Sequence, residues 1–285
     1  MTESILDSIT EKYSSLTKSG KKLANYILEN RLDTQYLSIT SLATNSGVSE
    51  ATITRFCRVL GLSGYNDLKL ALAKCERTND LGDTSDTPQA IHSNDDLFTM
   101  CKKLNDSYFT SFRETVEQLD VVSFNHAVDL LSRAEHVYCY GQGSSMVMAM
   151  EAWARFSTIT GKFIHIADSH MQAIATALST PRDVILFFSY SGATKDMVEI
   201  LDIARERAIP IILITHFRNS HAASFADVSL ICGYNESPLQ SGAVAAKIGQ
   251  LLLIDCLYYG YCSRQPEVTA AARTAVSEAV AKKLL

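Results

Sequence analysis

The sequence lacks any long uninterrupted hydrophobic run. Every apolar stretch in the 285 residues meets a polar or charged residue within a few positions, so no segment is suited to cross a bilayer. The N-terminal residues 1–15 have no basic flank followed by an apolar segment, which argues against a secretion signal. We therefore expect a cytoplasmic protein that makes no contact with membranes.

Paired cysteine motifs are also missing. The seven cysteines are scattered, odd in number and free of C-x-x-C spacing, which argues against a disulfide framework. Most of them lie in apolar stretches, and we expect free, buried thiols in a reducing compartment. The sequence predicts no metal ligands and no cofactor.

The chain as a whole has no excess of basic residues. Its formal net charge is −5 at pH 7, which argues against indiscriminate binding of nucleic acid. Residues 1–75 are weakly basic, with nine Lys or Arg and seven Asp or Glu. The content of 47% hydrophobic and 20% charged residues is typical of a globular protein, and the length suffices for two domains.

The periodicity of the sequence predicts two domains of different class. Residues 1–76 have helical spacing throughout and predict an all-α domain, whereas the polar, acidic stretch at 77–95 predicts a linker. From residue 96 to 285, helical patterns alternate with short apolar runs. This alternation predicts a three-layer α/β/α domain with a five-stranded parallel sheet. The five runs are HVYCYG, KFIHIA, DVILFFS, IPIILIT and DVSLIC.

The densest local signal in the first domain is a helix-turn-helix pattern. A short helix at 41–45 leads to a tight turn at 46–48, where Gly47 tolerates a positive φ. Ser49 has the chemistry of an N-cap for a second helix at 50–60. The apolar side chains of that helix, Ile53, Phe56, Cys57 and Leu60, share one face.

The opposite face of the second helix has the residue types that contact DNA. Arginines reach guanine edges or phosphates, and threonines reach either. The alternative is an ordinary αα-hairpin. Because the module is small and weakly basic, tight site-specific binding would need two copies, so we expect a homodimer or a tetramer. The predicted DNA-binding residues are Ser49, Thr52, Thr54, Arg55, Arg58 and Lys69.

Two predicted strands of the second domain end in hydroxyl-rich loops. GQGSS follows the first apolar run, and SYSGAT follows the third. Ligands of open parallel sheets bind beyond the carboxyl ends of the strands, where helix N-termini favour a phosphate. Each serine alone is equally an ordinary helix cap, but two such loops favour a phosphate site. A dinucleotide site is disfavoured, because Met146 replaces the third glycine of G-x-G-x-x-G.

The motifs of the two domains together resemble one family. GQGSS with SYSGAT is similar to the phosphosugar-binding loops of sugar isomerase (SIS) domains. GVSEATITRFCRVLGLSGYNDLK resembles the N-terminal module of RpiR-type bacterial transcriptional regulators, and the resemblance covers roughly residues 1–262. It implies a regulator of carbohydrate or amino-sugar metabolism whose binding to double-stranded operator DNA responds to a sugar phosphate.

The resemblance also implies the residues of the effector site. IADSHMQ resembles a segment that places Asp168, Ser169 or His170 near the sugar, and NESPLQSG offers Glu236 and Ser241 on a loop. The predicted sugar-phosphate-binding residues are Gly143, Ser144, Ser145, Ser189, Ser191, Gly192, Thr194, His170 and Glu236.

Two other functions fit parts of the sequence. A phosphosugar isomerase with a helical extension would need a general base, for which His170, His216 and Glu236 are the nominees. Their spacing gives no paired acid–base arrangement, and the N-terminal domain would have no role. A protein that regulates a sugar kinase through protein contacts is the third possibility. We predict a regulator that is not an enzyme and has no catalytic residue.

Overall fold

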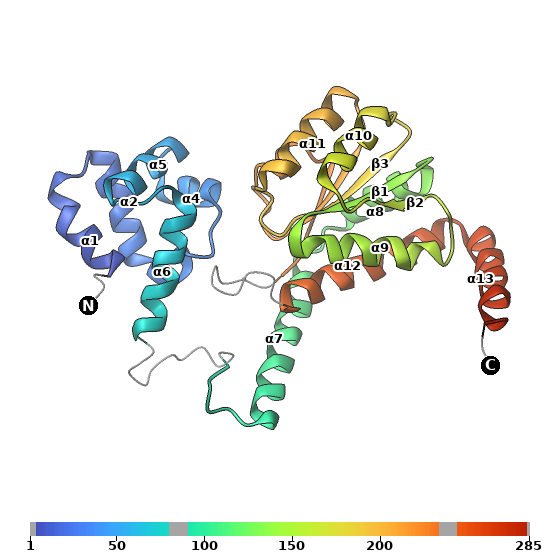
Figure 1. Ribbon diagram of the computed structural model, residues 1–285, viewed down its shortest axis with the longest axis horizontal. Helices are drawn as coiled ribbons and strands as arrows, with labels where there is room; N and C mark the ends of the chain where they lie inside the picture. The colour runs from blue at the N-terminus through green and yellow to red at the C-terminus, as the bar shows by residue number, and fades with distance from the viewer. Residues whose placement is uncertain (1–3, 80–90, 234–243, 284–285) are drawn as a thin grey trace. The chain divides into compact units, whose positions relative to one another are not determined.

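The computed structural model describes residues 4–79, 91–233 and 244–283 (Figure 1). The chain divides into two compact units, the first from Met1 to Asp106 and the second beginning at Ser107. Helix α7, Leu97–Glu117, contributes residues to both units.

The N-terminal unit is helical over residues 4–79. Its core is formed by buried side chains at helical spacing, which include Leu23, Ile27 and Ile53. The last helix of this segment runs to Asn79, three residues into the predicted linker at 77–95. The helices are α1 Ile5–Lys12, α2 Lys18–Glu29, α3 Arg31–Thr34, α4 Ile39–Ser46, α5 Glu50–Val59 and α6 Tyr65–Asn79.

The second unit is a three-layer α/β/α domain. Its described residues form one five-stranded parallel sheet, as the sequence predicts, and the structure gives the strand order as β2-β1-β3-β4-β5. Helices α10 and α11 cover one face, and α8, α9 and α12 cover the other (Figure 1). The elements are α8 Val121–Arg133, β1 Val137–Gly141, α9 Met146–Ser157, β2 Phe163–His165, α10 Ser169–Leu178, β3 Val184–Phe188, α11 Lys195–Glu206, β4 Ile211–Thr215, β5 Val228–Ile231, α12 Val244–Arg264 and α13 Pro266–Ala281.

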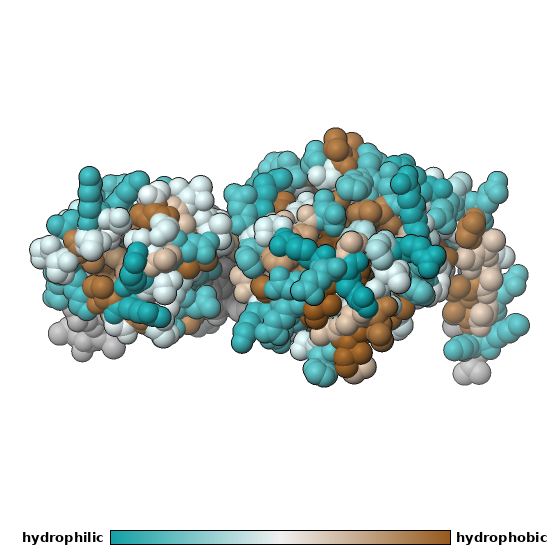
Figure 2. All heavy atoms as spheres, turned by 90° about the horizontal axis from the view of Figure 1, so that it is seen from above, coloured by the Kyte–Doolittle hydropathy of each residue, from teal (hydrophilic) through white to brown (hydrophobic). Residues whose placement is uncertain are grey.

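The surface is mainly polar but includes exposed hydrophobic side chains. Hydrophilic residues dominate the face seen in Figure 2, and several separate hydrophobic patches interrupt them. Exposed large hydrophobic residues on α7 include Phe98 and Phe109, which are 80% and 65% exposed. In the described part of the chain, no helix has both the length and the hydropathy that a membrane span requires.

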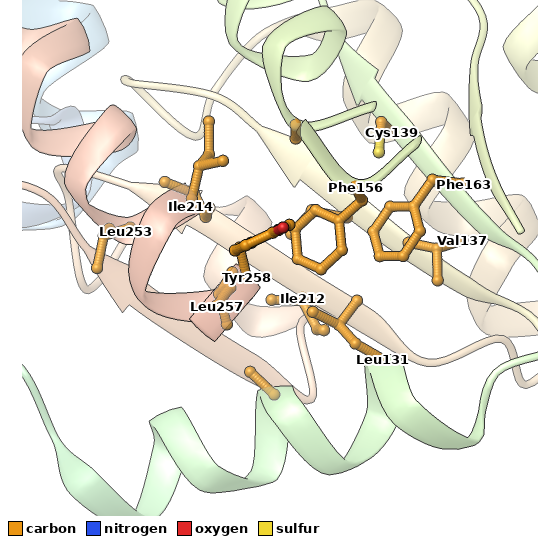
Figure 3. Close-up of a cluster of buried hydrophobic side chains, with 14 of the residues drawn as sticks. Leu131, Val137, Cys139, Phe156, Phe163, Ile212, Ile214, Leu253, Leu257 and Tyr258 are labelled. Carbon is orange, nitrogen blue, oxygen red and sulfur yellow. The ribbon is translucent and has the colours of Figure 1, made fainter. Parts of the chain in front are cut away.

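The core between the sheet and α9 is held by aromatic packing. Phe156 of α9 stacks on Phe163 of β2 with ring centroids 4.0 Å apart, and it meets Tyr258 of α12 edge-on at 5.6 Å (Figure 3). On the surface of the same helices, Arg155 donates to Asp255 over 2.9 Å and lies 3.9 Å from the centroid of the Tyr258 ring. These contacts hold α9 against the sheet and against α12.

All seven cysteines lie in described residues and are free, as expected. The expectation that most are buried is wrong. Cys57, Cys139 and Cys232 are buried, three others are half-buried, and Cys101 is exposed on α7. A helical pattern alone does not reveal which face of α7 packs inward. Burial raises the pKa of the Cys57 thiol to about 11, so this cysteine is held as an unreactive thiol.

Two glycines with positive φ shape the loops after β1 and β3. Gly143 has φ +56° and open space around it, whereas Gly192 has φ +59° and lies directly against the side chain of Ser220. A Cβ at Gly192 would overlap the Ser220 hydroxyl. The backbone of Ala222 also donates to the Gly192 carbonyl over 3.0 Å. The second loop is therefore packed tightly against the segment that follows β4, and the first loop is not.

This difference predicts unequal effects of two alanine substitutions. Gly143→Ala should lower the free energy of unfolding by about 1–2 kcal/mol, the cost of left-handed backbone for an L-residue. Gly192→Ala should lower it by about 2–5 kcal/mol, because overpacking against Ser220 adds to that cost. Urea denaturation of both variants and of Gly192→Ala/Ser220→Gly measures the difference. Equal effects of the two single substitutions, or no recovery in the double variant, would contradict the packing seen here.

Candidate functional site

The two hydroxyl-rich loops leave the same edge of the sheet. Strands β1 and β3 are parallel neighbours whose last residues, Gly141 and Phe188, are in register. One loop leads from β1 into α9, and the other leads from β3 into α11. The N-termini of both helices therefore begin at this edge, where unpaired backbone N–H groups and the helix dipoles favour an anion.

The first loop leaves two hydroxyls open. Gly143–Ser145 forms a short 3-10 turn, and a Cβ at Gly141 would overlap the backbone of Ser145, so the strand must end in glycine. Ser145 precedes α9 without capping it, and neither its hydroxyl nor that of Ser144 has a hydrogen-bond partner in the described part of the chain. Both hydroxyls are thus available to a ligand.

The first loop also holds a residue that the sequence analysis missed. Both polar atoms of the Gln142 side chain are buried, and neither has a hydrogen-bond partner among the described residues. An unpaired buried amide costs about 1–3 kcal/mol. In the sequence Gln142 simply stands between two glycines, and nothing in that pattern signals a buried amide.

The hydroxyls of the second loop have different roles. Ser189 is 5% exposed, and its Oγ accepts a hydrogen bond from the Gly192 N–H over 3.2 Å, so it shapes the turn from inside. The Ser191 Oγ accepts from Ala193 over 3.4 Å. Thr194 stands at the N-cap of α11 but makes no side-chain capping bond. Of the predicted residues in this loop, Thr194 offers the most accessible unengaged hydroxyl.

The segment after β4 supports the second loop. The Thr215 hydroxyl donates to the Tyr190 carbonyl over 3.1 Å, and the His216 N–H donates to the same carbonyl over 3.1 Å. The His216 ring stacks on the Tyr190 ring with centroids 5.1 Å apart. His216 was nominated from the sequence as a catalytic base, but the structure places it in packing contact with the loop.

The residues predicted near the sugar follow β2, the strand on the other side of β1. Asp168 is the N-cap of α10, and its carboxylate accepts from the Met171 N–H over 2.8 Å. His170 is exposed in the first turn of α10. Glu236 and Ser241 lie outside the described residues.

The helix-turn-helix is formed by α4 and α5. Gly47 ends α4 in the left-handed conformation with φ 61°, and the Ser49 Oγ accepts from the Thr52 N–H over 3.3 Å at the start of α5. The two helices are joined by a 2.7 Å hydrogen bond from Thr40 to Glu50. The predicted turn and N-cap are therefore present, with α4 two residues longer at its N-terminal end than predicted.

The two faces of α5 are those predicted from its sequence. Arg55 and Arg58 are exposed and Thr52 and Thr54 are half-buried, opposite the buried side chains of Ile53, Phe56 and Cys57. The predicted contact Lys69 lies on α6, with its ammonium 5.9 Å from the centroid of the Tyr65 ring.

Each half of the chain matches a known protein family. Residues 3–78 match the helix-turn-helix domain of the rpiR family, and residues 130–259 match the SIS domain. An HTH-type transcriptional regulator of Caldanaerobacter subterraneus subsp. tengcongensis is 34% identical over 258 residues, which cover 89% of each chain. The HTH-type transcriptional regulator HexR of Pseudomonas aeruginosa is 28% identical over 268 residues, covering 92% of this chain and 90% of HexR.

A solved structure is similar over the full length. The Vibrio vulnificus NanR protein complexed with ManNAc-6P has a TM-score of 0.87 and 29% sequence identity, and the match covers 98% of this chain and 99% of NanR. The relatives are named as transcriptional regulators, which supports a regulator rather than an enzyme. The protein belongs to the rpiR family of HTH-type transcriptional regulators, in which a helix-turn-helix domain is joined to a SIS domain.

Proposed function

We propose that this regulator binds double-stranded operator DNA through α5 and that a sugar phosphate held between the β1 and β3 loops modulates that binding. The observation that carries the proposal is the meeting of two hydroxyl-bearing loops and two helix N-termini at one edge of the sheet. The bound ManNAc-6P in NanR supports a sugar phosphate as the effector and amino-sugar or carbohydrate metabolism as the regulated process. Such a regulator works in the cytoplasm.

The phosphate group has suitable donors in both loops. Ser144, Ser145 and Thr194 supply neutral hydroxyls, and the first turns of α9 and α11 supply backbone N–H groups. These groups bind an anion without a permanent positive charge, and the helix dipoles add to the attraction. His170 and Glu236 are proposed sugar contacts, and Ser189, Ser191, Gly143 and Gly192 hold the loops in shape.

The DNA-binding surface is proposed on α5. Arg55 and Arg58 are three residues apart, so they project from the same side of the helix. Both are exposed, and Arg55 donates to the Thr52 hydroxyl over 3.4 Å. The DNA backbone on either side of the two arginines is proposed to contact Ser49, Thr54 and Lys69.

Helix α7 is proposed as the interface of a homodimer, because its buried side chains are polar and its exposed side chains include large hydrophobic ones. Its buried side chains are Ser107, Ser111 and Thr115, whereas its exposed face carries Leu97, Phe98, Phe109, Phe112 and Val116. Exposed aromatic side chains in this number favour burial against another protein surface. We refer to this exposed face as the α7 seam.

The charges beside the α7 seam favour a second copy of the chain as its partner. Lys102, Asp106, Arg113 and Glu117 are exposed along one side of the helix. If two α7 helices pack antiparallel about a two-fold axis near Phe109, Lys102 faces Glu117 and Asp106 faces Arg113 of the other copy. A two-fold interface requires such a self-complementary surface. A dimer also supplies the two DNA-binding modules that a paired operator needs.

Charge reversal in the α7 seam tests the dimer. Lys102→Glu should raise the dimer dissociation constant by about fivefold, since it places like charges opposite each other in two symmetric contacts. Lys102→Glu/Glu117→Lys should restore it. Phe112→Asp should raise the dimer dissociation constant by more than tenfold, because it removes an aromatic side chain that anchors the interface. Analytical ultracentrifugation measures each constant, with Leu178→Asp on α10 as the control. A monomeric wild-type protein, or no rescue in the double variant, would exclude this interface.

Loss of a loop hydroxyl should weaken effector binding. Ser145→Ala and Thr194→Val should each raise the dissociation constant for ManNAc-6P by about 10- to 100-fold, the effect of removing one hydrogen bond to a charged group. Ser157→Ala, at the other end of α9, should leave it unchanged. Isothermal titration calorimetry of ManNAc-6P, glucose 6-phosphate, fructose 6-phosphate and the unphosphorylated sugars measures these affinities. The site is wrongly assigned if Ser145→Ala and Thr194→Val bind as the wild type does.

Arginine replacement on α5 should weaken DNA binding without affecting the effector. Arg55→Ala should cost about 1–3 kcal/mol of operator affinity if it reads a base, with relaxed specificity at one position. Arg31→Ala on α3 is the control. Fluorescence anisotropy with a DNA fragment selected by the wild-type protein from a random-sequence pool measures the affinity at several salt concentrations. Unchanged operator affinity in Arg55→Ala and Arg58→Ala would place the DNA interface elsewhere.

A further inference from the structure

A continuous set of contacts crosses the carboxyl edge of the sheet from the second loop to helix α7. We propose that His216 and Thr115 couple the Ser189–Thr194 loop to α7, so that effector binding at the loop repositions this helix. The proposal rests on the proposed function and adds to it the residues that carry the signal. The first two steps of the path each move one strand along the order β3-β4-β5, and the third passes from β5 to α7.

The first step joins the loop to the end of β4. The Tyr190 carbonyl accepts hydrogen bonds from the Thr215 hydroxyl and from the His216 N–H, each over 3.1 Å. The rings of Tyr190 and His216 are nearly parallel, with 6° between their planes. Because both the backbone and the ring of Tyr190 are held, a shift of the loop displaces His216.

The second step joins β4 to the end of β5. The His216 Nδ1 lies 2.9 Å from the Cys232 carbonyl oxygen. A carbonyl oxygen only accepts hydrogen bonds, so Nδ1 carries the proton in this contact. The Cys232 N–H in turn donates to the Thr215 carbonyl over 2.9 Å. The position of His216 therefore fixes the backbone at Cys232 and at the next residue, Gly233.

The third step joins β5 to α7. The Gly233 N–H donates to the Thr115 hydroxyl over 2.9 Å, and this hydroxyl donates to the Ser111 carbonyl over 2.7 Å. A Cβ at Gly233 would overlap the Glu114 side chain and lie 2.8 Å from the Thr115 nitrogen. Glycine is required there because the backbone packs directly on the helix. A shift at Gly233 is thus passed to α7 through a buried hydrogen bond.

The packing of α7 suits a helix that moves. Its buried side chains, Ser107, Ser111 and Thr115, are small and polar, and Ser111 donates to the Ala245 carbonyl of α12 over 2.6 Å. Gly249 of α12 lies so close that its Cβ would be 3.1 Å from the Ser111 hydroxyl. Because this contact has no large side chains that interlock, a small shift of α7 does not require large side chains to repack. The opposite face of α7 is the proposed dimer seam.

Matched substitutions distinguish a role in coupling effector binding to DNA binding from a role in the stability of the fold alone. Thr115→Val keeps the shape of the side chain and removes the hydroxyl, and Thr115→Ser restores the hydroxyl. His216→Phe keeps the stacking on Tyr190 and removes the Nδ1 donor, and His216→Asn restores a donor. A merely structural role would change the melting temperature of these variants and leave the coupling between the two ligands intact.

The measurement is the affinity of the full-length protein for ManNAc-6P with and without the selected operator DNA. The ratio of the two dissociation constants is the coupling factor, about 5–150 in allosteric proteins. It should fall to nearly 1 in Thr115→Val and His216→Phe and return in Thr115→Ser and His216→Asn. The affinity of the DNA-free protein for ManNAc-6P should change less than twofold in all four variants.

Hydrogen exchange provides a second readout in the wild-type protein. ManNAc-6P should change the exchange rate of the Gly233 amide and of residues 111–117, and Thr115→Val should remove the change at 111–117. If the variants keep the wild-type coupling factor, the path is wrong and the proposed function stands. If neither ManNAc-6P, glucose 6-phosphate nor fructose 6-phosphate alters the operator affinity of the wild-type protein, the proposed function fails, and the path fails with it.

Discussion

The parallel register between β1 and β3 is the constraint on which the proposed effector site depends. Five consecutive pairs, from Val137 and Val184 to Gly141 and Phe188, align the two strands. All five residues of β3 are buried, because helices cover both faces of the sheet. A slip of one residue would turn every side chain of the strand to the other face, which the close packing of both faces opposes. The two loops therefore leave the sheet at fixed neighbouring positions.

The two loops differ in how closely they are packed. The second loop is tied to the end of β4 through Tyr190 and lies against Ser220 through Gly192, whereas Gly143 in the first loop has open space around it. A ligand that bridges them would join an open loop to a supported one. Among the described residues, the contacts traced to α7 begin at the supported loop, so the proposed signal leaves the effector site from that side. A ligand shifts a conformational equilibrium only by its difference in affinity for the two states.

Helix α7 lies between the contacts from the proposed effector site and the proposed dimer interface. Its inner face makes hydrogen bonds through Ser111 and Thr115, and its outer face carries exposed aromatic residues. An amphipathic helix of a monomer has the opposite arrangement. The inversion is explained if α7 lies between the sheet of one copy and the α7 helix of another. A displacement produced by the effector would then change the dimer geometry, and with it the spacing of the two DNA-binding modules.

Much of the fold follows from local patterns in the sequence. The five continuous apolar runs predict the buried strands. The helical spacing of apolar residues in Glu50–Val59 predicts the buried and exposed faces of α5. The hydroxyls of Ser144, Ser145 and Thr194 are also recognisable from their place after strands. The neighbours of His216 are not, because strand order brings Tyr190 and Cys232 to it from distant parts of the chain. The buried amide of Gln142 and the inverted polarity of α7 likewise depend on tertiary packing.

The most direct test of the central claim is a crystal structure of the protein with ManNAc-6P bound. The account predicts that the phosphate lies between the β1 and β3 loops, within hydrogen-bonding distance of the Ser145 and Thr194 hydroxyls and of the first backbone N–H groups of α9 and α11. A phosphate bound at any other place, in a crystal whose protein binds the ligand in solution, would contradict it.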